Sequence, residues 1–286
     1  WWNVNLIFIP LILTLIAFFG VITFSKLKNK TSQKIGLIIT VICLFCPLIF
    51  YKYTNFFYVQ VLGYIYQHEY EPLFQYGIPL GISFITFTLI SYVVDVYKKK
   101  YPVILNFNLL LSYVLYFPQL IAGPILRPAQ LIPQLKKNNI NKRNKLFSVS
   151  VKIGLAIIAV GVIKKVIIAD KIAAAIDPVF LMEFSGNEWL YLLAIYGFTV
   201  QIYCDFSGYT DIAIGTAKIL GVRLPKNFER PYLATSPINF WRKWHITLSS
   251  WLRDYLYIPL GGARKGKINK IFNIIITMIL GGLWHG

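Results

Sequence analysis

Charged residues are scarce in this chain of 286 residues, at 14%, whereas a soluble domain contains about 25%. Acids are the scarcest, with 11 Asp and Glu against 29 Lys and Arg. Hydrophobic residues make up 57% of the chain, and the mean hydropathy is +0.60. These values exclude an ordinary soluble domain and predict a protein that crosses a membrane several times.

Histidine and cysteine are also rare, with three residues of each. His68, His245 and His285 show no H-x-x-x-H spacing, and the C-x-x-C of Cys43 and Cys46 has no second copy. A metal site is therefore not expected. The G-x-S-x-G motif of serine hydrolases is absent as well. Because a histidine at membrane depth needs partners or a function, His245 and His285 are the first candidates for chemistry, whereas His68 is expected to be solvated.

Long hydrophobic runs account for the apolar composition. Six near-continuous runs are present: Leu6–Phe24, Ile35–Tyr51, Ile78–Val96, Leu146–Ile163, Trp189–Cys204 and Ile271–Trp284. A membrane-spanning helix needs about 17 to 25 residues, so the first four runs are long enough and the last two need flanking residues. We therefore expect an all-α fold, a polytopic transmembrane helix bundle.

The basic residues are clustered rather than spread along the chain. Of the 29 Lys and Arg, 23 fall in four stretches: Lys26–Lys34, Lys98–Lys100, Arg127–Lys145 and Arg223–Lys270. Acids are concentrated in two intervening segments, Lys52–Gln75 and Asp170–Glu188. This alternation is typical of the positive-inside rule and predicts that the four basic stretches are cytoplasmic. A nucleic-acid partner is not expected, because no aromatic-basic module stands apart from the apolar runs.

The segment Phe107–Ile125 is apolar but lies between two stretches that are both predicted to be inside. One crossing would place its ends on opposite sides of the membrane. Pro118, Gly123 and Pro124 would also interrupt a helix. We therefore expect a re-entrant or interfacial hairpin that is buried in protein.

The chain shows no internal repeat, low-complexity linker or separate soluble domain. Residues 1–286 are accordingly expected to form a single membrane domain. The first residue is not Met, and the sequence stops directly after His285. We expect from this that the chain is a fragment and that helices C-terminal to it are missing.

Aromatic and charged side chains alternate in Phe240–Pro259, which contains three Trp and two Tyr. Arg253 and Asp254 lie in the same segment. This composition is typical of a helix at the membrane interface. Anchoring explains the aromatic and basic residues but does not require His245, whose alternative role is that of an interfacial hydrogen-bonding residue.

A polar cluster follows the fifth apolar run, in Gln201–Asp211. It includes Asp205, Tyr209 and Asp211, which need partners at this depth. Two interpretations are open. The cluster either forms a buried hydrogen-bond network that fixes helix packing or lines a substrate path.

The segment Gly261–Ile268 nearly matches the phosphate-binding pattern G-x-x-x-x-G-K-[ST]. It fails at Ile268, which has no hydroxyl group for magnesium. We interpret the segment as a basic cytoplasmic turn whose charge attracts the phosphates of a soluble acyl donor.

Several motifs together resemble the membrane-bound O-acyltransferase family, and within it the bacterial alginate and peptidoglycan O-acetyltransferase membrane subunits. The resemblance covers roughly Ile78 to the end of the chain. The matching segments are Tyr116–Pro124, Lys164–Asp170, Asp205–Tyr209, Asn227–Tyr232, Phe240–Tyr257 and Gly281–Gly286. The last two are the most specific.

The resemblance implies roles for individual residues. His285 corresponds to the family's catalytic histidine, and His245 to the partner position upstream. We expect His285 to act as general base and His245 to orient substrate or stabilise the oxyanion. Six further residues are expected to contact substrate: Asp205, Tyr209, Asp211, Arg253, Asp254 and Trp284. The family also implies re-entrant and interfacial helices around a central tunnel, with later helices that are missing here.

The implied reaction is transfer of an acetyl group from acetyl-CoA, without a bound cofactor. The donor would enter from the cytoplasm, and the acceptor would be a polysaccharide such as peptidoglycan or alginate, reached through an exported acetyltransferase partner. The implied location is the bacterial cytoplasmic (inner) membrane, with the lipid bilayer as surroundings. The richness in Ile, Lys, Asn, Phe and Tyr is consistent with an AT-rich genome and favours peptidoglycan or another cell-surface glycan over alginate. Two alternatives are D-alanyl transfer to teichoic acid and a transporter with a buried His/Asp relay.

Overall fold

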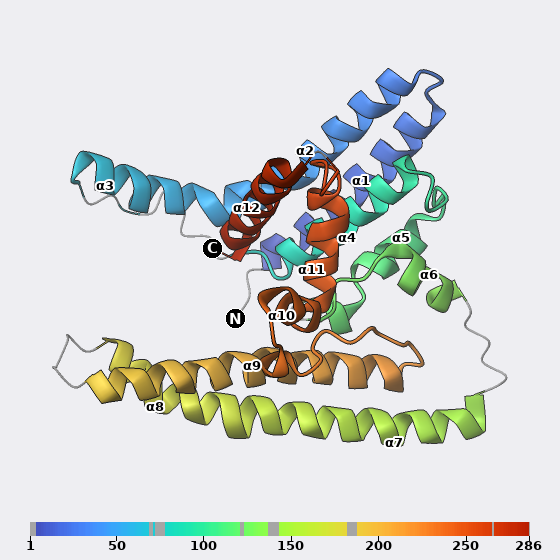
Figure 1. The fold of residues 1–286 in the computed structure, drawn as a ribbon. Helices are drawn as coiled ribbons and strands as arrows, with labels where there is room; N and C mark the ends of the chain where they lie inside the picture. Colours follow the sequence, from blue (N-terminus) through green and yellow to red (C-terminus); the bar gives the residue numbers. More distant parts are fainter. Residues whose placement is uncertain are drawn as a thin grey trace. The chain divides into compact units, whose positions relative to one another are not determined.

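The computed structural model describes residues 4–68, 71, 78–120, 123–136, 143–181, 188–264 and 266–285. Within these residues every regular element is a helix (Figure 1). The chain divides into two compact units: unit 1 comprises residues 1–121, 125–136 and 248–286, and unit 2 comprises residues 122–124 and 137–247. The prediction of an all-α fold is confirmed.

Unit 1 is built from both ends of the chain. Its elements are η1 (Val4–Ile7), α1 (Phe8–Lys26), α2 (Lys30–Asn55), η2 (Phe56–Leu62), α3 (Gly63–Tyr66), α4 (Ile82–Tyr97), α5 (Phe107–Val114), η3 (Phe117–Gln119), α6 (Pro128–Lys136), η7 (Arg253–Tyr257) and α12 (Gly266–His285). Unit 2 contains α7 (Arg143–Val162), η5 (Ile163–Ala169), α8 (Asp170–Leu181), α9 (Glu188–Ile219), η6 (Pro231–Leu233) and α10 (Pro237–Lys243). The helix α11 (Ile246–Leu252) begins in unit 2 and ends in unit 1.

Among the described residues, four helical segments are long and apolar enough to cross a membrane. They are Phe8–Lys26, Lys30–Tyr66, Glu188–Ile219 and Gly266–Trp284. They include four of the six predicted apolar runs, and the two short runs do gain flanking residues. The run Leu146–Ile163 lies in α7 and η5, which continue into α8, but several of its side chains fall outside the described residues.

The predicted apolar run Ile78–Val96 forms a helix that is shorter than the run and largely covered by protein. It forms α4, which has 16 residues, of which 12 are buried. Helices α1, α2, α5 and α6 all pack against it. The sequence of α4 is apolar without interruption because α4 is the central helix of unit 1 and is covered by protein. A helix that faces lipid has the same kind of sequence.

The described part of the segment Phe107–Ile125 is interrupted rather than one continuous helix, which agrees with the predicted effect of Pro118. The helix α5 has only eight residues and is followed by the short helix η3. The hydroxyl group of Tyr113 donates a hydrogen bond to the carbonyl of Leu126 (2.9 Å), and the Gln119 amide donates to the carbonyl of Tyr113 (3.0 Å). These buried bonds tie the two arms together and satisfy backbone groups that a broken helix leaves open.

Two predicted cytoplasmic stretches meet at one end of unit 1. Phe24 and Gln33, at the turn between α1 and α2, line the same cavity as Tyr97 and Lys99 at the end of α4. This arrangement agrees with the positive-inside interpretation, which requires Lys26–Lys34 and Lys98–Lys100 to lie on one side.

Four glycines bring α7 and α9 of unit 2 into close contact. A Cβ atom at Gly208 would lie 2.8 Å from the carbonyl oxygen of Gly161, and one at Gly161 would lie 2.7 Å from that of Gly208. Gly154 and Gly215 show the same reciprocal relation, at 2.8 and 2.6 Å. The two helices therefore run antiparallel with their backbones in contact, the packing that small residues allow in membrane helices.

Candidate active site

An apolar cavity of about 520 Å³ lies within unit 1, between α2, α4, α12 and the segment from α11 to η7. Its walls come from Val41, Phe45, Leu48, Ile49, Tyr53, Phe57, Phe87, Ile90, Val94, Trp251, Leu252, Tyr255, Leu256, Leu280, Leu283 and Trp284. The lining extends from Tyr255 at one end to Trp284 at the other. Residues from two of the motif segments, Phe240–Tyr257 and Gly281–Gly286, thus line the same cavity.

Three stacked aromatic rings form one wall of this cavity. Phe87 of α4 lies between Trp251 and Trp284, with ring centroids 4.1 Å from the former and 5.1 Å from the latter. The Trp251 indole N–H donates hydrogen bonds to the Phe87 carbonyl (3.1 Å) and to the Ser91 hydroxyl (2.8 Å). Because the buried N–H is satisfied and the rings are stacked, α11 and α12 are both fixed against α4.

The last turn of α12 is held by α2. The ammonium group of Lys52 donates a hydrogen bond to the carbonyl of Trp284, and the hydroxyl group of Tyr53 donates one to the carbonyl of Leu283 (2.6 Å). A cation is stabilised at the C-terminal end of a helix, where carbonyls are unpaired. His285 follows directly as the last residue of α12, so the predicted general base belongs to a turn that borders the cavity; its side chain lies outside the described residues.

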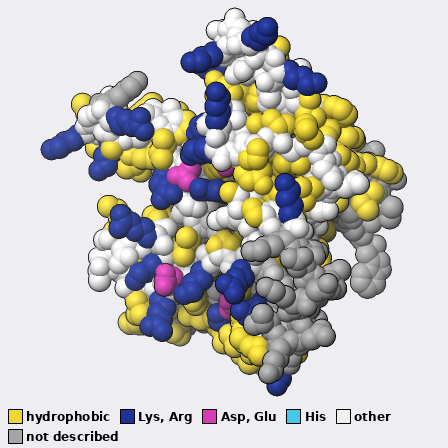
Figure 2. All heavy atoms as spheres, turned by 90° about the vertical axis from the view of Figure 1, so that its right-hand side faces the viewer, with side chains coloured by type: hydrophobic (Ala, Val, Ile, Leu, Met, Phe, Trp, Pro, Cys, Tyr) yellow, Lys and Arg dark blue, Asp and Glu magenta, His cyan; other side chains and the backbone are white. Residues whose placement is uncertain are grey.

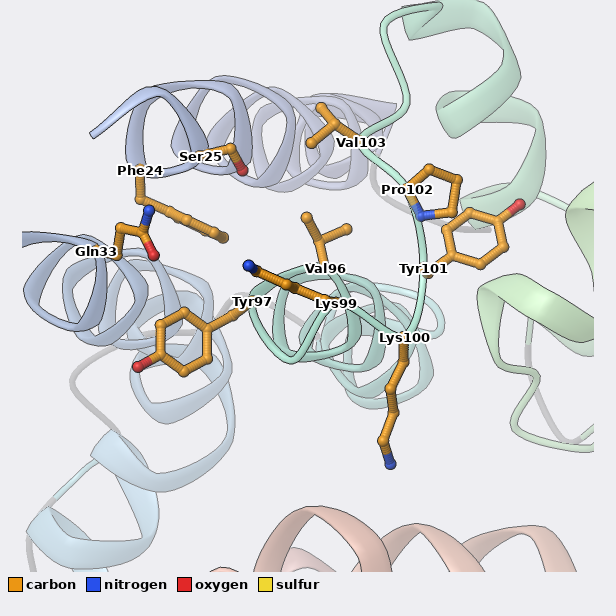
Figure 3. Close-up of a pocket in the computed structure, with 10 residues that line it drawn as sticks. All are labelled: Phe24, Ser25, Gln33, Val96, Tyr97, Lys99, Lys100, Tyr101, Pro102 and Val103. Carbon is orange, nitrogen blue, oxygen red and sulfur yellow. The ribbon is translucent and has the colours of Figure 1, made fainter. Parts of the chain in front are cut away.

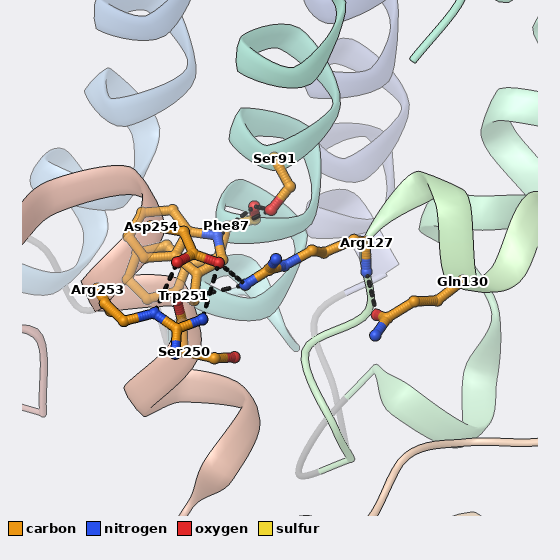
Figure 4. A network of polar contacts seen from close by, with 8 residues as sticks. All are labelled: Phe87, Ser91, Arg127, Gln130, Ser250, Trp251, Arg253 and Asp254. Atoms are coloured by element: carbon orange, nitrogen blue, oxygen red, sulfur yellow. Dashed lines mark hydrogen bonds and ion pairs between the residues drawn. The ribbon is translucent and has the colours of Figure 1, made fainter. Parts of the chain in front are cut away.

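A cluster of charges lies at the other end of the cavity (Figure 4). The carboxylate of Asp254 pairs with the guanidinium of Arg127 (2.5 Å) and with that of Arg253 (2.7 Å), and Arg127 also donates to the carbonyl of Ser250 (3.3 Å). Burial raises the pKa of Asp254, but the hydrogen bond from Arg253 and the charge of Arg127 outweigh it, so the pKa lies below its usual range. The side chain of Arg253 is still 60% exposed and is available to an anionic ligand.

Asp254→Asn is expected to destabilise the full-length protein by roughly 1–3 kcal/mol at neutral pH, because the partly buried guanidinium of Arg127 and the more exposed one of Arg253 lose their anion. Since the folded-state pKa is lowered, the carboxylate stabilises the fold above the unfolded pKa of about 4, and this contribution disappears as the pH falls through the folded pKa. The melting temperatures of wild type and variant should therefore differ at pH 7 and converge in acid. Asp177→Asn, at an exposed position on α8, is the control; an equal effect of both variants would contradict the role of Asp254.

Tyr255 connects the charged cluster to the cavity. Its hydroxyl group hydrogen-bonds with the carboxylate of Asp95, and its ring lies 5.5 Å from the guanidinium carbon of Arg127 and 5.9 Å from the ammonium of Lys98. Burial and the charge of Asp95 raise the pKa of Tyr255, so the phenol stays protonated and acts as a donor. Basic residues from three predicted cytoplasmic stretches (Lys98, Arg127 and Arg253) therefore gather at this end.

The other predicted catalytic residue, His245, belongs to unit 2. Its side chain is only 2% exposed, and its ring contacts those of Phe206 (4.5 Å between centroids) and Phe228 (6.4 Å). Its backbone has a φ of +40°, a left-handed conformation that is costly for a residue with a side chain. The imidazole is therefore held in a defined, largely dry position.

The strained conformation of His245 divides the predicted interfacial helix. Helix α10 ends at Lys243, and α11 begins at Ile246. The side-chain oxygen of Asn227 accepts hydrogen bonds from the Thr247 N–H (3.1 Å) and hydroxyl (2.9 Å), and the Asn227 carbonyl accepts from the Ile246 N–H (2.9 Å). Asn227 thus caps α11 and fixes the bend.

The predicted substrate residues on α9 are engaged by two lysines of η5. Lys164 pairs with Asp211 (2.6 Å), and Lys165 pairs with both Asp170 (2.7 Å) and Asp205. The Lys165 ammonium also lies 5.3 Å from the ring of Tyr209. These contacts support the interpretation of the cluster as a network that fixes helix packing.

The structure groups the predicted site residues in two sets. Arg253, Asp254, Trp284 and His285 belong to unit 1, and the remaining four, including His245, belong to unit 2. In the described part of the chain, no three His, Cys, Asp or Glu residues are grouped as metal ligands would be.

Several residues of unit 1 were not predicted as site residues. Phe87, Trp251 and Tyr255 line the cavity, and Lys52 and Arg127 bind Trp284 and Asp254 beside it. Lys52 could have been identified from the sequence, because it is the only charged residue between Lys34 and Glu69, in an otherwise apolar stretch.

Three known proteins are similar in sequence to this chain. The chain is 42% identical over 263 residues to the probable alginate O-acetylase AlgI of Pseudomonas syringae pv. tomato, covering 91% of the chain and 49% of the relative. It is 37% identical over 314 residues to the peptidoglycan O-acetyltransferase of Helicobacter pylori, covering 100% of the chain and 58% of the relative. The teichoic acid D-alanyltransferase of Bacillus subtilis is 29% identical over 219 residues, covering 72% and 53%. The chain thus spans about half the length of these curated relatives.

A protein-family model also matches the chain. The model named MBOAT, membrane-bound O-acyltransferase family, matches residues 99–286, which is more than half of the chain. The match includes the charged cluster, the η5 lysines and the turn before His285. On the family match and the identity to these relatives, the chain belongs to the membrane-bound O-acyltransferase family.

Proposed function

We propose that the full-length protein is an O-acetyltransferase of the bacterial cytoplasmic membrane. It takes an acetyl group from acetyl-CoA on the cytoplasmic side and delivers it, through an exported acetyltransferase partner, to a hydroxyl group of a cell-surface polysaccharide. The single observation that carries the proposal is the apolar cavity, which extends from the charged cluster around Asp254 to the turn that ends at His285.

The two ends of the cavity suit the two ends of the donor. The exposed guanidinium of Arg253 and the nearby basic turn after Leu260 attract phosphates of coenzyme A. The apolar walls accept the thin thioester arm and exclude water, which protects the thioester from hydrolysis.

The chemistry needs a base near the thioester. A neutral imidazole at His285 accepts the proton of the acceptor hydroxyl as its oxygen attacks the acetyl carbon. The carbon–sulfur bond then breaks, and the proton passes to the leaving thiolate of coenzyme A. His245 orients the acceptor or stabilises the oxyanion, a role suited to a ring held by Phe206 and Phe228.

The names of the relatives favour acetyl over D-alanyl as the transferred group. Two relatives that cover nine tenths or more of the chain are named as an alginate and a peptidoglycan O-acetylating protein, whereas the D-alanyltransferase covers less of it at lower identity. Composition favours peptidoglycan or another wall glycan over alginate. A transporter with a His/Asp relay is disfavoured, because Asp205 and Asp211 are neutralised by lysines.

The function is tested by the ester content of the cell surface. Acetate released by mild base from purified wall glycan and exopolysaccharide should fall in a strain that lacks the gene and return with the full-length gene. D-Alanine ester on teichoic acid, measured in the same cells, should stay constant. If the strain that lacks the gene kept its acetate ester but lost its D-alanine ester, the proposed function would be D-alanylation instead of acetylation.

A further inference from the structure

A second cavity, of about 470 Å³, lies at the basic end of unit 1 and shares no lining residue with the apolar cavity (Figure 3). It lies where the end of α1, the first turns of α2 and the loop after α4 meet. Phe24, Val96, Pro102 and Val103 supply apolar walls, and Ser25 and Gln33 add polar groups. The apolar walls mean that it is suited to a ligand that is partly hydrophobic.

One lysine reaches into this cavity. In Figure 3 the side chain of Lys99 extends towards Phe24 and Gln33, whereas that of Lys100 points away. Lys99 has a φ of +57°, at the position after a helix end where glycine is the usual residue. A lysine at this costly position is a reason to look for a function of its ammonium group.

The carbonyls at the end of α4 do not oppose an anion here. The N–H groups of Lys99 and Lys100 donate to the carbonyls of Val96 (2.9 Å) and Asp95 (2.8 Å), and that of Tyr101 also donates to Asp95 (3.2 Å). Carbonyls at the negative end of the helix are therefore engaged by backbone N–H groups, which reduces their repulsion of an anion beside Lys99.

The rim of the cavity is strongly basic. Residues 24–34 and 96–103 contain no acid. They contain seven exposed lysines: Lys26, Lys28, Lys30, Lys34, Lys98, Lys99 and Lys100. In Figure 2, Lys and Arg side chains gather at the top, where the turn between α1 and α2 lies, beside hydrophobic surface.

We propose that this cavity binds the phosphate of an anionic phospholipid headgroup, with Lys99 as its direct partner. The cavity lies at the end of α1, a segment that is long enough to span the membrane, and therefore at headgroup depth. Basic pockets between membrane helices on the cytoplasmic side recognise anionic lipids in this way. The apolar walls accommodate the glycerol backbone, which a free inorganic phosphate lacks.

Binding is measured by titrating phosphatidylglycerol against the purified full-length protein in detergent and counting bound lipid by native mass spectrometry. Lys99→Gly should weaken the apparent affinity about fivefold or more, because one basic contact is lost. Lys99→Arg should retain it. Lys28→Ala, which removes a charge from the same end but not from the cavity lining, should change it by less than about twofold, because a more distant charge acts on the ligand only through screening solvent.

The Lys99→Gly variant also allows a loss of binding to be distinguished from a loss of stability. Glycine adopts φ +57° freely, so lipid-free Lys99→Gly should melt no lower than wild type. Phosphatidylcholine should bind all variants alike. Equal losses in Lys99→Gly and Lys28→Ala would overturn the proposal, and so would displacement of phosphatidylglycerol by equimolar coenzyme A or inorganic phosphate, which would assign the cavity to a soluble phosphate. The mass spectrometry measures lipid binding and requires no enzymatic activity, so its result is independent of the proposed acetyl transfer.

Discussion

His285→Ala in the full-length protein is expected to reduce acetylation of the surface glycan by about 10² to 10⁴-fold, because loss of a general base removes this much of the rate. The residue ends the helix whose last turn is fixed by Lys52, Tyr53 and the stacked rings of Phe87 and Trp284. A base on such a fixed turn can be placed within hydrogen-bond reach of an acceptor.

The measurement compares acetate released from wall glycan by strains that carry wild type, His285→Ala or His68→Ala. His68 follows α3 in an exposed position and lies outside the motifs, so its substitution should leave acetate unchanged. Protein levels in the membrane should match in all three strains. Full acetate in His285→Ala at normal protein level would remove the catalytic assignment.

Gly208→Ala is expected to destabilise unit 2, because it fills a close contact between two helix backbones. The added Cβ atom would lie 2.8 Å from the Gly161 carbonyl oxygen and 3.0 Å from the Lys165 backbone nitrogen. Backbone atoms cannot rotate away, so α7 and α9 must separate, and the neighbouring Lys164–Asp211 ion pair must stretch with them. Such overpacking costs about 1–3 kcal/mol, more than the gain of about 1 kcal/mol in helix propensity.

The matched control is Gly197→Ala on the same helix. There the nearest atoms are the side-chain carbons of Ile176 and Ile172, at 3.0 and 3.5 Å, which are free to adjust. Thermal unfolding of the full-length protein in detergent should show a melting temperature several degrees lower for Gly208→Ala and near wild type for Gly197→Ala. Similar values for both variants would mean that the close glycine contact does not hold the two helices together.

Composition and hydrophobic runs were sufficient to predict the all-α membrane fold, because the bilayer imposes length and polarity on its helices. They did not reveal that α4, formed by the run Ile78–Val96, is covered by other helices of the protein. Lipid and protein core are equally apolar, so a continuous run cannot distinguish them.

The candidate site was only partly predictable for a different reason. The motifs included Asn227, His245 and His285, but they did not show that the side chain of Asn227 caps α11 and fixes the bend at His245. Likewise, Asp211 is paired with Lys164, 47 residues away. Contacts of this kind arise from the packing of helices and leave no local pattern in the sequence.

Acetyl transfer across the membrane is the central claim, and inverted membrane vesicles test it most directly, because their cytoplasmic face is turned outward. Vesicles with the full-length protein are given radiolabelled acetyl-CoA from outside. Label should appear inside as a base-labile ester on glycan or on the exported partner with wild type, and only at background level with His285→Ala. Label that stays in acetyl-CoA with wild type, or that enters equally with His285→Ala, would contradict the account.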